Sequence, residues 1–567
     1  MMNESAFRPS FKKVLVANRG EIAIRIIRAC QELGIRTVAI YSDADKNSFY
    51  YRIADEAHNI KGSSARQTYL NIEKVLDVAR KTGCAAVHPG YGFLSENPDF
   101  ASACNEAGIK FIGPSSACMR KIADKAHIKK TMQVNGIPVL PSIESEADSD
   151  RLRILTKEMG FPLIVKPSFG GGGKGMRIVR SGEELEDALR YARAIGKSAF
   201  RNEAFYIEKY LEKPRHVEVQ ILADSDGKII ALGERECSIQ RSHQKLIEES
   251  PSPALTPEKR NEVIELAKKA AAVVEYENAG TIEFLYYDGR FYFLEVNGRI
   301  QVEHSVTELV TGMDLVKEQI RIACGGKIEE SMQDIPADGW AIQCRINAED
   351  PYNQFAPSPG TITGYRAPGG MGVRVDTGIF MGYTIPTQYD SLVSKLSVWG
   401  RDRTEAVSRM RRVLSEYVIL GIRTLLPLHR AIFREKNFLN GDYTTNYVEE
   451  HLEDLLESMK QIEKSEKSHD ELLAEVFTSV CRLVLNENHA RNSKATSGVA
   501  PFPEGSHAEV SEEETIAVIA AAIAVAMESE GTPIRSLAQR SATVNTWATI
   551  GRIAQMNQRL PCLQRQR

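Results

Sequence analysis

Polar side chains that bind ions alternate with apolar ones between Glu295 and Glu303. The alternating polar residues are Glu295, Asn297, Arg299, Gln301 and Glu303. Because successive side chains of a strand point to opposite faces, this spacing predicts one polar row along an extended segment. A solvated edge strand would also alternate, but such a face is normally rich in Lys, Thr and Ser. The preceding apolar run 292–294 favours burial, so the row indicates a binding or catalytic site.

A further carboxylate, Glu283, lies upstream of this row, across a predicted hairpin with Asp288 and Gly289 at its turn. A two-residue turn would pair Glu283 with Leu294 and put Glu283 and Glu295 on opposite faces. A three-residue loop, 287–289 with Gly289 left-handed, or an equivalent bulge puts both carboxylates on one face. We predict this second arrangement, because Mg²⁺ prefers one or two carboxylates together with nucleotide phosphates.

A glycine-rich stretch, 169–176, follows the strand-like run Leu163–Lys166. Glycines allow backbone N–H groups to close around phosphate oxygens, because no Cβ keeps the anion away. The stretch is neither a Walker loop nor a dinucleotide-binding fingerprint. Taken alone it also fits a surface loop, so the neighbouring motifs decide between the two interpretations.

The composition is that of a globular protein, with 43% hydrophobic and 26% charged residues among 567. A net charge of −3 gives no field for wrapping nucleic acid or holding a membrane surface. The longest apolar run, 516–527, is too short to span a bilayer, and the N-terminus lacks the apolar core of a signal peptide. Nine cysteines without CxxC spacing favour neither a disulfide framework nor a zinc site. We therefore expect a cytoplasmic protein with no membrane span and no nucleic-acid partner.

The chain begins with an alternation of strand-like and helical patterns. The predicted strands are Val14–Ala17, Thr37–Tyr41, Ala85–His88 and Lys110–Ile112, with a helix at Glu21–Leu33. This order is typical of an open parallel α/β sheet. Mixed α/β patterns follow to about residue 335, then short strands with Pro/Gly turns and the helical run 404–417. After about residue 450 the sequence predicts a charged helix, a linker and an alanine-rich helix.

In these motifs the sequence resembles the biotin carboxylase branch of the ATP-grasp enzymes, over residues about 11–450. The matching motifs stand in the family's order. They are Ala17–Ala23, His88–Asn97, the glycine loop, Glu208–Leu211, Pro214–Glu218, Cys237–Arg241 and Arg345–Asp350. The resemblance implies an α/β fold in which an N-terminal parallel domain precedes an ATP-grasp domain with a mobile lid. The domain ranges that it predicts are 11–122, 123–335 with a lid at about 138–211, 338–450, a charged helical segment 451–485, a linker 486–511, and a helix with tail 512–567.

The resemblance also implies a two-step reaction. ATP phosphorylates bicarbonate to carboxyphosphate, and the CO₂ released from it carboxylates biotin. The residues expected to bind ATP are Lys125, Lys166, Gly170, Gly171, Gly172, Gly173, Lys174, Gly175, Glu208, Lys209, Leu211, His216, Gln240 and His243. Glu283, Glu295 and Asn297 would hold Mg²⁺ or Mn²⁺. Lys245 and Arg299 would pair with bicarbonate beside Gln301 and Val302.

Two further residues would carry the acceptor chemistry. Glu303 would be the general base, kept ionised by the neighbouring cations, and Arg345 would stabilise the enolate-like ureido oxygen of biotin. The sequence departs from the family pattern in several places. Gly298 stands where Thr or Pro is usual, Ser305 where Pro is usual, Trp340 and Gln343 where His and Glu are commoner, and Leu425 where Asn is common. We expect the glycine at 298 to loosen the chain between the metal residues and Arg299.

The expected partners are a biotin carrier protein, a second copy of the chain, and a carboxyltransferase. The Met459-Lys460 pair resembles a biotinylation site, but it lies in a predicted charged helix, so we expect the carrier to be a separate protein. The tail weakly resembles the small subunit of sodium-pumping decarboxylases, which suggests a further docking partner; a helix folding back on the body is equally consistent. Two other functions stay open: a different ATP-grasp ligase, and a non-catalytic assembly subunit.

Overall fold

The computed structural model describes residues 8–144, 149–167, 176–195, 205–332 and 335–465. The chain divides into two units, Met1–His469 and Asp470–Arg567. The second unit lies outside the described residues, and with it the predicted linker 486–511 and the helix and tail 512–567. Within the described residues, none of the helices combines the length and apolar character needed to cross a membrane.

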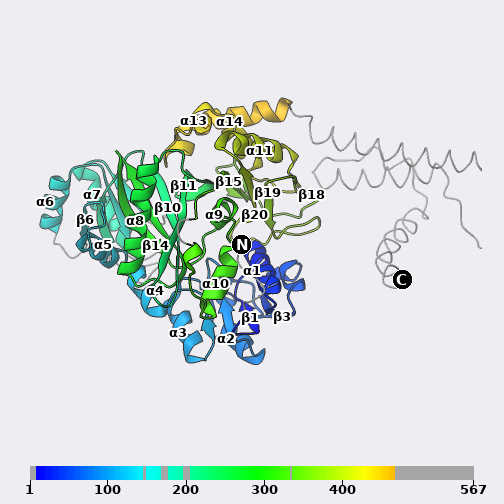
Figure 1. The fold of residues 1–567 in the computed structure, drawn as a ribbon. Helices are drawn as coiled ribbons and strands as arrows, with labels where there is room; N and C mark the ends of the chain where they lie inside the picture. Colours follow the sequence, from blue (N-terminus) through cyan, green and yellow to red (C-terminus); the bar gives the residue numbers. More distant parts are fainter. Residues whose placement is uncertain (1–7, 145–148, 168–175, 196–204, 333–334, 466–567) are drawn as a thin grey trace, which may run out of the picture. The chain divides into compact units, whose positions relative to one another are not determined.

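The first layer is a five-stranded parallel sheet in the order β3-β2-β1-β4-β5 (Figure 1). Its strands are β1 (Lys13–Val16), β2 (Arg36–Tyr41), β3 (Glu56–Asn59), β4 (Ala86–His88) and β5 (Lys110–Phe111). Helices α1 (Gly20–Glu32), α2 (Ile72–Lys81) and α3 (Pro98–Glu106) complete this part. Val14 and Val16 pack into one buried cluster with α1, and Leu15 packs into another with α2 and α3. Both faces of the sheet are therefore buried, and the predicted open parallel α/β architecture is confirmed.

A small antiparallel sheet in the order β6-β9-β7-β8 lies within the predicted lid range. Its strands are β6 (Ser142–Glu144), β7 (Leu163–Pro167), β8 (Arg177–Val179) and β9 (Phe205–Lys209), with helices α6 (Ser149–Met159) and α7 (Gly182–Ile195). It has its own apolar core, built mainly from β7, β9 and α7. Helices α4 (Ser116–Ala123) and α5 (Lys125–Val134) precede it in the chain.

The largest element is an eight-stranded antiparallel sheet in the order β14-β13-β10-β11-β12-β15-β20-β19. Its strands are β10 (Arg215–Ala223), β11 (Ile229–Arg241), β12 (Gln244–Ser250), β13 (Asn278–Tyr287), β14 (Arg290–Asn297), β15 (Trp340–Asn347), β19 (Val373–Thr377) and β20 (Leu392–Gly400). The pairing of β12 with β15 makes one sheet from strands on both sides of residue 335, so the ATP-grasp strands continue into those of the predicted C-terminal domain.

Helices cover this sheet and close its end. They are α8 (Pro257–Val273), α9 (His304–Thr311), α10 (Leu315–Ala323), α11 (Arg403–Glu416), α12 (Leu426–Ile432), α13 (Lys436–Asn440) and α14 (Tyr447–Ser465). Short strands β16 (Glu349–Asp350), β17 (Ala356–Pro357), β18 (Gly364–Arg366) and β21 (Val418–Leu420) form two small ribbons. Helix α14 packs Leu455, Met459 and Ile462 into the same core as α11 and α12, along the edge drawn uppermost in Figure 1. Lys460 lies on this helix, 3.5 Å from Glu457, as expected for a residue of a charged helix.

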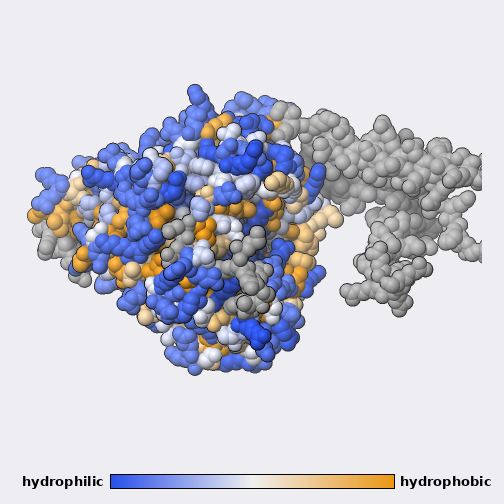
Figure 2. Space-filling model, in the orientation of Figure 1, coloured by the Kyte–Doolittle hydropathy of each residue, from blue (hydrophilic) through white to orange (hydrophobic). Residues whose placement is uncertain are grey.

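Hydrophilic and apolar residues intermingle on the face of the molecule drawn in Figure 2. The most exposed large apolar side chains among the described residues are Val134, Met371, Met381 and Ile154. The function is sought in the cavity described next.

Candidate active site

One cavity of about 1030 Å³ brings together residues from the segments that follow β1 and β4, from the small sheet and from the large sheet. Sixteen of the predicted site residues line it: Lys125, Lys166, Glu208, Lys209, Leu211, His216, Gln240, His243, Lys245, Glu283, Glu295, Asn297, Arg299, Gln301, Val302 and Arg345. Glu303 is fully buried and is bonded to two of these lining residues. The loop residues Gly170–Gly175, Lys174 included, lie outside the described residues.

The hairpin that carries Glu283 and Glu295 takes the second of its two predicted forms, a two-residue turn with a bulge. Its turn has two residues, Asp288 and Gly289, both with positive φ, and Tyr287 pairs with Arg290. Of the two predicted forms, the three-residue loop is therefore not the one present. A bulge at Leu294 then shifts the register, so that Glu283 pairs directly with Glu295. Directly opposite residues point to the same face, so the predicted same-face arrangement of the two carboxylates is confirmed by way of the bulge.

Charged residues continue this line across the sheet. Arg235 on β11 pairs with Glu218 on β10, Glu218 pairs with Glu283, and Glu283 pairs with Glu295. Like charges directly opposite one another destabilise a sheet, and burial adds to that cost. A row of three carboxylates is retained only where cations compensate it, which makes this face of the sheet a site for positively charged groups.

The predicted polar row from Glu295 to Glu303 does not lie on one extended segment. Strand β14 ends at Asn297, and Glu303 is the N-cap residue of α9. The chain turns between them, and its side chains still converge: Asn297 Nδ2 and Gln301 Nε2 both donate to Glu283 Oε1, at 2.8 and 2.9 Å. Arg299 donates to the oxygens of both amides, which fixes their orientation.

The carboxylate pair fits a divalent cation. Glu283 and Glu295 both face the cavity, and Lys125 Nζ lies 2.7 Å from Glu295 Oε2. His216 Nε2 lies 2.8 Å from Glu283 Oε2 without hydrogen-bond geometry. Burial would raise the pKa of Glu283, but Lys245 and His216 outweigh it and hold that pKa well below its usual range. Two ionised carboxylates beside a cavity are the oxygen ligands that Mg²⁺ prefers.

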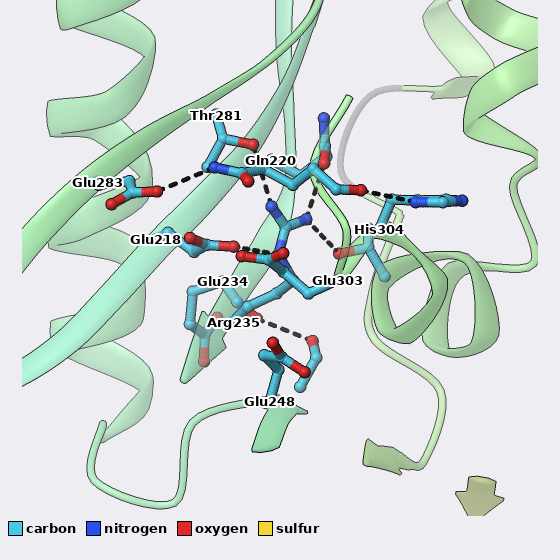
Figure 3. Close-up of polar contacts among 12 residues, drawn as sticks. Glu218, Gln220, Glu234, Arg235, Glu248, Thr281, Glu283, Glu303 and His304 are labelled. Atoms are coloured by element: carbon cyan, nitrogen blue, oxygen red, sulfur yellow. Dashed lines mark hydrogen bonds and ion pairs between the residues drawn. The ribbon is translucent and has the colours of Figure 1, made fainter. Parts of the chain in front are cut away.

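Lys245 is the cation at the centre of the buried carboxylates. Its Nζ donates to Glu218 Oε2 at 2.5 Å, Glu283 Oε1 at 3.0 Å and Glu303 Oε1 at 2.7 Å. Burial lowers the pKa of Lys245, and these three carboxylates raise it well above its ordinary value. Figure 3 shows the Arg235 guanidinium among Glu218, Gln220 and Thr281, with which it makes hydrogen bonds.

Arg345 completes the environment of Glu303. Its Nη2 donates to Glu303 Oε2 at 2.8 Å, and its Nε donates to Glu248 Oε1 at 2.5 Å. Burial alone would raise the pKa of Glu303, but Lys245, Arg345 and Arg235 together hold it far below its ordinary value. Glu303 is therefore ionised at neutral pH, with both oxygens directed at cations.

Lysines dominate the opposite end of the cavity. Lys166 Nζ lies 2.5 Å from Glu208 Oε2, and Lys129 forms a second ion pair with Glu208 Oε1. Burial raises the pKa of Glu208, and the two lysines outweigh it and lower that pKa to about 2. Three ammonium groups, those of Lys125, Lys129 and Lys166, thus face two carboxylates, which leaves this end suited to an anion such as a phosphate chain.

The other predicted nucleotide residues lie around the same space. Lys209 donates from Nζ to the carbonyl oxygens of Gly160 and Phe161, so its ammonium group holds the chain before β7. Burial lowers the pKa of His243, so its imidazole is neutral at physiological pH. Leu211, His216 and Gln240 also line the cavity, and none of them carries a negative charge.

Gly298 has a packing role that the sequence did not reveal. A Cβ there would lie 2.9 Å from Ile122 Cδ1, and the Gly298 N–H donates to Glu96 Oε1 at 3.1 Å. The same Glu96 carboxylate accepts a hydrogen bond from Arg299 Nε. The expected loosening of the chain stays a prediction, while the Glu96 carboxylate bonds both Gly298 and Arg299.

Five residues of this network had no role predicted from the sequence: Glu218, Arg235, Glu248, Glu96 and Lys129. Glu218 and Glu96 lie inside recognised motifs, and the spacing of Glu218 two residues after His216 on a strand was a signal for the same face. Arg235 and Glu248 act through strand register, which only the folded sheet reveals.

Family models match most of the chain. They are described as "Biotin carboxylase, N-terminal domain" at residues 10–119, "Carbamoyl-phosphate synthase L chain, ATP binding domain" at 124–331, and "Biotin carboxylase C-terminal domain" at 343–450.

Named relatives agree with these models. A pyruvate carboxylase subunit of Methanothermobacter thermautotrophicus is 52% identical, over 82% of this chain and 95% of its own length. Biotin carboxylase 1 of Bacillus subtilis is 49% identical, over 77% of this chain and 98% of its own. A similar solved structure is the biotin carboxylase domain dimer of Hydrogenobacter thermophilus 2-oxoglutarate carboxylase, in complex with magnesium ADP, ADP and bicarbonate. Its TM-score is 0.77 at 48% identity, over 79% of this chain and 99% of that one.

Proposed function

The chain belongs to the biotin carboxylase family of ATP-dependent ligases, and on that premise we propose that it carboxylates biotin with ATP and bicarbonate. The observation that carries the proposal is the position of Glu303. Its two oxygens accept from Lys245 and Arg345 at the wall of a cavity whose other end is lined by Lys125 and Lys166. A base, an anion site and a phosphate site thus share one space.

The lysine end is proposed to bind the triphosphate. Lys125 and Lys166 exchange their carboxylate partners for phosphate oxygens, and the loop 170–175 is proposed to close over them. Glu208, Lys209 and Leu211 bind the adenine end, and His216, Gln240 and His243 lie near the ribose and phosphates. Glu283 and Glu295, with Asn297 beside them, would hold the Mg²⁺ or Mn²⁺ ion, which neutralises phosphate charge when bound.

Bicarbonate is proposed to bind between Lys245 and Arg299, next to Gln301 and Val302. There its oxygen attacks the γ-phosphorus, the bond to the ADP oxygen breaks, and carboxyphosphate forms. Glu303 takes the bicarbonate proton. A bound anion takes up part of the positive charge of Lys245 and Arg299, which raises the pKa of Glu303 toward that of a working base.

Carboxyphosphate then decomposes to CO₂ and phosphate. Glu303 first releases the bicarbonate proton to solvent; the released phosphate then takes the proton from N1 of biotin and passes it to Glu303, while N1 forms the new bond to the carbon of CO₂. Negative charge develops on the ureido oxygen in this step. Arg345 donates to that oxygen, and because the charge exists only near the transition state, the interaction lowers the barrier and not the substrate's ground state.

The biotin is proposed to arrive on a separate carrier protein. The carboxylated carrier is then proposed to serve a carboxyltransferase that acts on an acyl-CoA or a 2-oxo acid.

The domain dimer seen for the Hydrogenobacter thermophilus relative supports a homodimer. We also propose a cytoplasmic location, as the sequence pattern predicts. Docking of a further protein to the C-terminal helix is a separate proposal, resting on the sequence of residues 512–567 alone. The domain limits 11–122, 123–335 and 338–450 are proposed likewise.

Phosphate release from ATP tests the function. We expect release that requires bicarbonate and rises on addition of free biotin. Bicarbonate-dependent release without any biotin effect would indicate another ATP-grasp ligase. No release above the rate without protein would indicate a non-catalytic assembly subunit.

A further inference from the structure

Two positions at which the sequence departs from the biotin carboxylase pattern, Ser305 and Gln343, are in contact in the folded chain. Ser305 Oγ donates to Gln343 Oε1 at 2.5 Å, and both side chains are fully buried. They lie on different elements, Ser305 in the first turn of α9 and Gln343 in β15. Their contact therefore links the helix that follows Glu303 to the strand that carries Arg345.

Gln343 extends the link toward Arg345. Its Nε2 donates to Glu248 Oε2 at 2.9 Å, while Glu248 Oε1 accepts from Arg345 Nε. Glu248 and Gln343 are direct partners across β12 and β15, so their side chains share one face. Each carboxylate oxygen of Glu248 thus has one donor, and the donor on Gln343 fixes which oxygen faces the arginine.

In this series of hydrogen bonds, the groups at its two ends determine which atom donates and which accepts at every step. Because Gln343 Nε2 faces a carboxylate, its Oε1 must accept, so the single Ser305 proton is committed to it. Ser305 Oγ also lies 2.9 Å from Ser397 Oγ, on β20 directly opposite Gln343. Ser397 must therefore be the donor of that bond. The result is a one-way sequence of donors running from Ser397 through Ser305 and Gln343 to Glu248.

The start of α9 is consequently joined to β15 at two points. One is the contact of Glu303 with Arg345, and the other is the contact of Ser305 with Gln343. A proline at position 305 would suit the first turn of a helix but would remove the hydroxyl and the second contact. A glutamate at position 343 would set a second carboxylate against Glu248.

We propose that Ser305 and Gln343 are positioning residues for biotin carboxylation, which hold the Arg345 guanidinium in register with Glu303. The proposal rests on the proposed function, since it assigns Arg345 to the ureido oxygen of biotin. Gln343 acts directly on Glu248, and Ser305 acts by orienting the Gln343 amide.

Steady-state kinetics with free biotin and MgATP test this. A hydrogen bond to a buried charged group is worth about a factor of 10 or more, so Gln343→Met should lower kcat/KM for biotin about 10-fold. Ser305→Ala should lower it about 3-fold, and Ser305→Thr, which keeps the hydroxyl, should restore the wild-type value. KM for MgATP should change less than about 2-fold in each variant, because the lysine end is untouched.

Non-additivity is the decisive readout. Since Ser305 acts only through Gln343, Ser305→Ala should add no further loss in the Gln343→Met background. Ser394→Ala is the matched control, because it removes a buried hydroxyl from the same strand as Ser397 but outside the donor sequence. It should leave the biotin kinetics unchanged.

Three results would overturn the proposal: unchanged biotin kinetics in Gln343→Met, independent losses that multiply in the double variant, or an equal rise in KM for MgATP. Wild-type protein without biotin-stimulated phosphate release would instead refute the proposed function itself. If Gln343→Met fails to fold, as a collapsed melting transition would show, Ser305→Ala and Ser305→Thr decide alone. A Ser305→Ala variant with wild-type kcat/KM for biotin then overturns the proposal.

Discussion

The two ends of the cavity hold their charges in different ways. At the lysine end, Lys125 has a single carboxylate partner, Glu295, and both side chains are about one-third exposed, at 27% and 32%. At the acceptor end, Lys245 is shared by three carboxylates and Arg345 by two, and Glu303 is 0% exposed. At the lysine end this pair stands alone and is accessible, beside a small buried cluster of Glu208 with Lys129 and Lys166, whereas the acceptor end is one larger closed network.

The difference indicates what each end does. A lysine with one accessible partner can release it to a phosphate group at the cost of one weak ion pair. In the network, removing one charge leaves its buried partners uncompensated, which costs several kcal/mol. We therefore expect changes at the lysine end to alter nucleotide affinity, and changes at the acceptor end to alter catalysis without altering nucleotide affinity.

The largest effect should come from Glu303→Gln. Loss of a general base typically costs a factor of 10² to 10⁴, so biotin-dependent phosphate release should fall by roughly that amount while MgATP still binds. Calorimetric titration with MgATP beside the phosphate assay measures both. Glu308→Gln is a suitable control, since Glu308 is a buried carboxylate of α9 outside the cavity lining. Loss of MgATP binding in Glu303→Gln would contradict the division between the two ends.

Arg345→Lys should have the next largest effect. Lysine cannot bond Glu248 and Glu303 at once through a planar fork, so the charge remains while its position is lost. We expect kcat/KM for biotin to fall about 10²-fold, with KM for MgATP unchanged. Arg412→Lys serves as a comparison, because Arg412 makes an exposed pair with Glu416. A rise in KM for MgATP as large as the fall in kcat/KM for biotin would contradict the division of roles between the two ends of the cavity.

Lys125→Met should affect the opposite parameter. One lost charge-assisted contact to phosphate should raise KM for MgATP by roughly 10-fold or more, with little change in KM for biotin. Lys121→Met removes an exposed lysine paired with Glu275 nearby and should change neither. If KM for biotin rose in this variant while KM for MgATP stayed constant, Lys125 would act at the acceptor end, and its assignment to the lysine end would be contradicted.

The smallest effect concerns stability and pH. The pKa of Glu208 is lowered from 4.5 to about 2 because Lys166 and Lys129 outweigh the effect of burial. A carboxylate whose folded pKa is depressed stabilises the fold fully above about 4.5 and loses that contribution as the pH falls toward 2. Glu208→Gln should therefore flatten the fall of the melting temperature below pH 4.5. Equal slopes for wild type and variant would show that the ion pairs contribute nothing measurable.

The sequence predicted the lysine end better than the acceptor end, for a physical reason. The parallel sheet and the carboxylate pair depend on local patterns, and the same-face arrangement of Glu283 and Glu295 followed from strand parity; the role of the glycine stretch stays a prediction. The sequence predicted a longer loop or an equivalent bulge, because a two-residue turn and a bulge together give the same parity as a longer loop. Parity alone cannot separate those two solutions.

The network around Glu303 depends on which strands are neighbours. Glu218 faces Glu283, and Glu248 faces Gln343, because β10 pairs with β13 and β12 pairs with β15. No local pattern contains those pairings, so Arg235 and Glu248 could not be assigned from the sequence. The packing of Gly298 could not be predicted for a similar reason, since Ile122, whose Cδ1 would lie 2.9 Å from a Cβ there, is distant in the chain.

Incorporation of radiolabelled bicarbonate into free biotin tests the central claim most directly. With MgATP present, we predict label in acid-labile carboxybiotin in wild-type protein, none without ATP, and none in Glu303→Gln even though that variant binds MgATP. Cleavage of ATP by wild-type protein with no label on biotin would contradict the account.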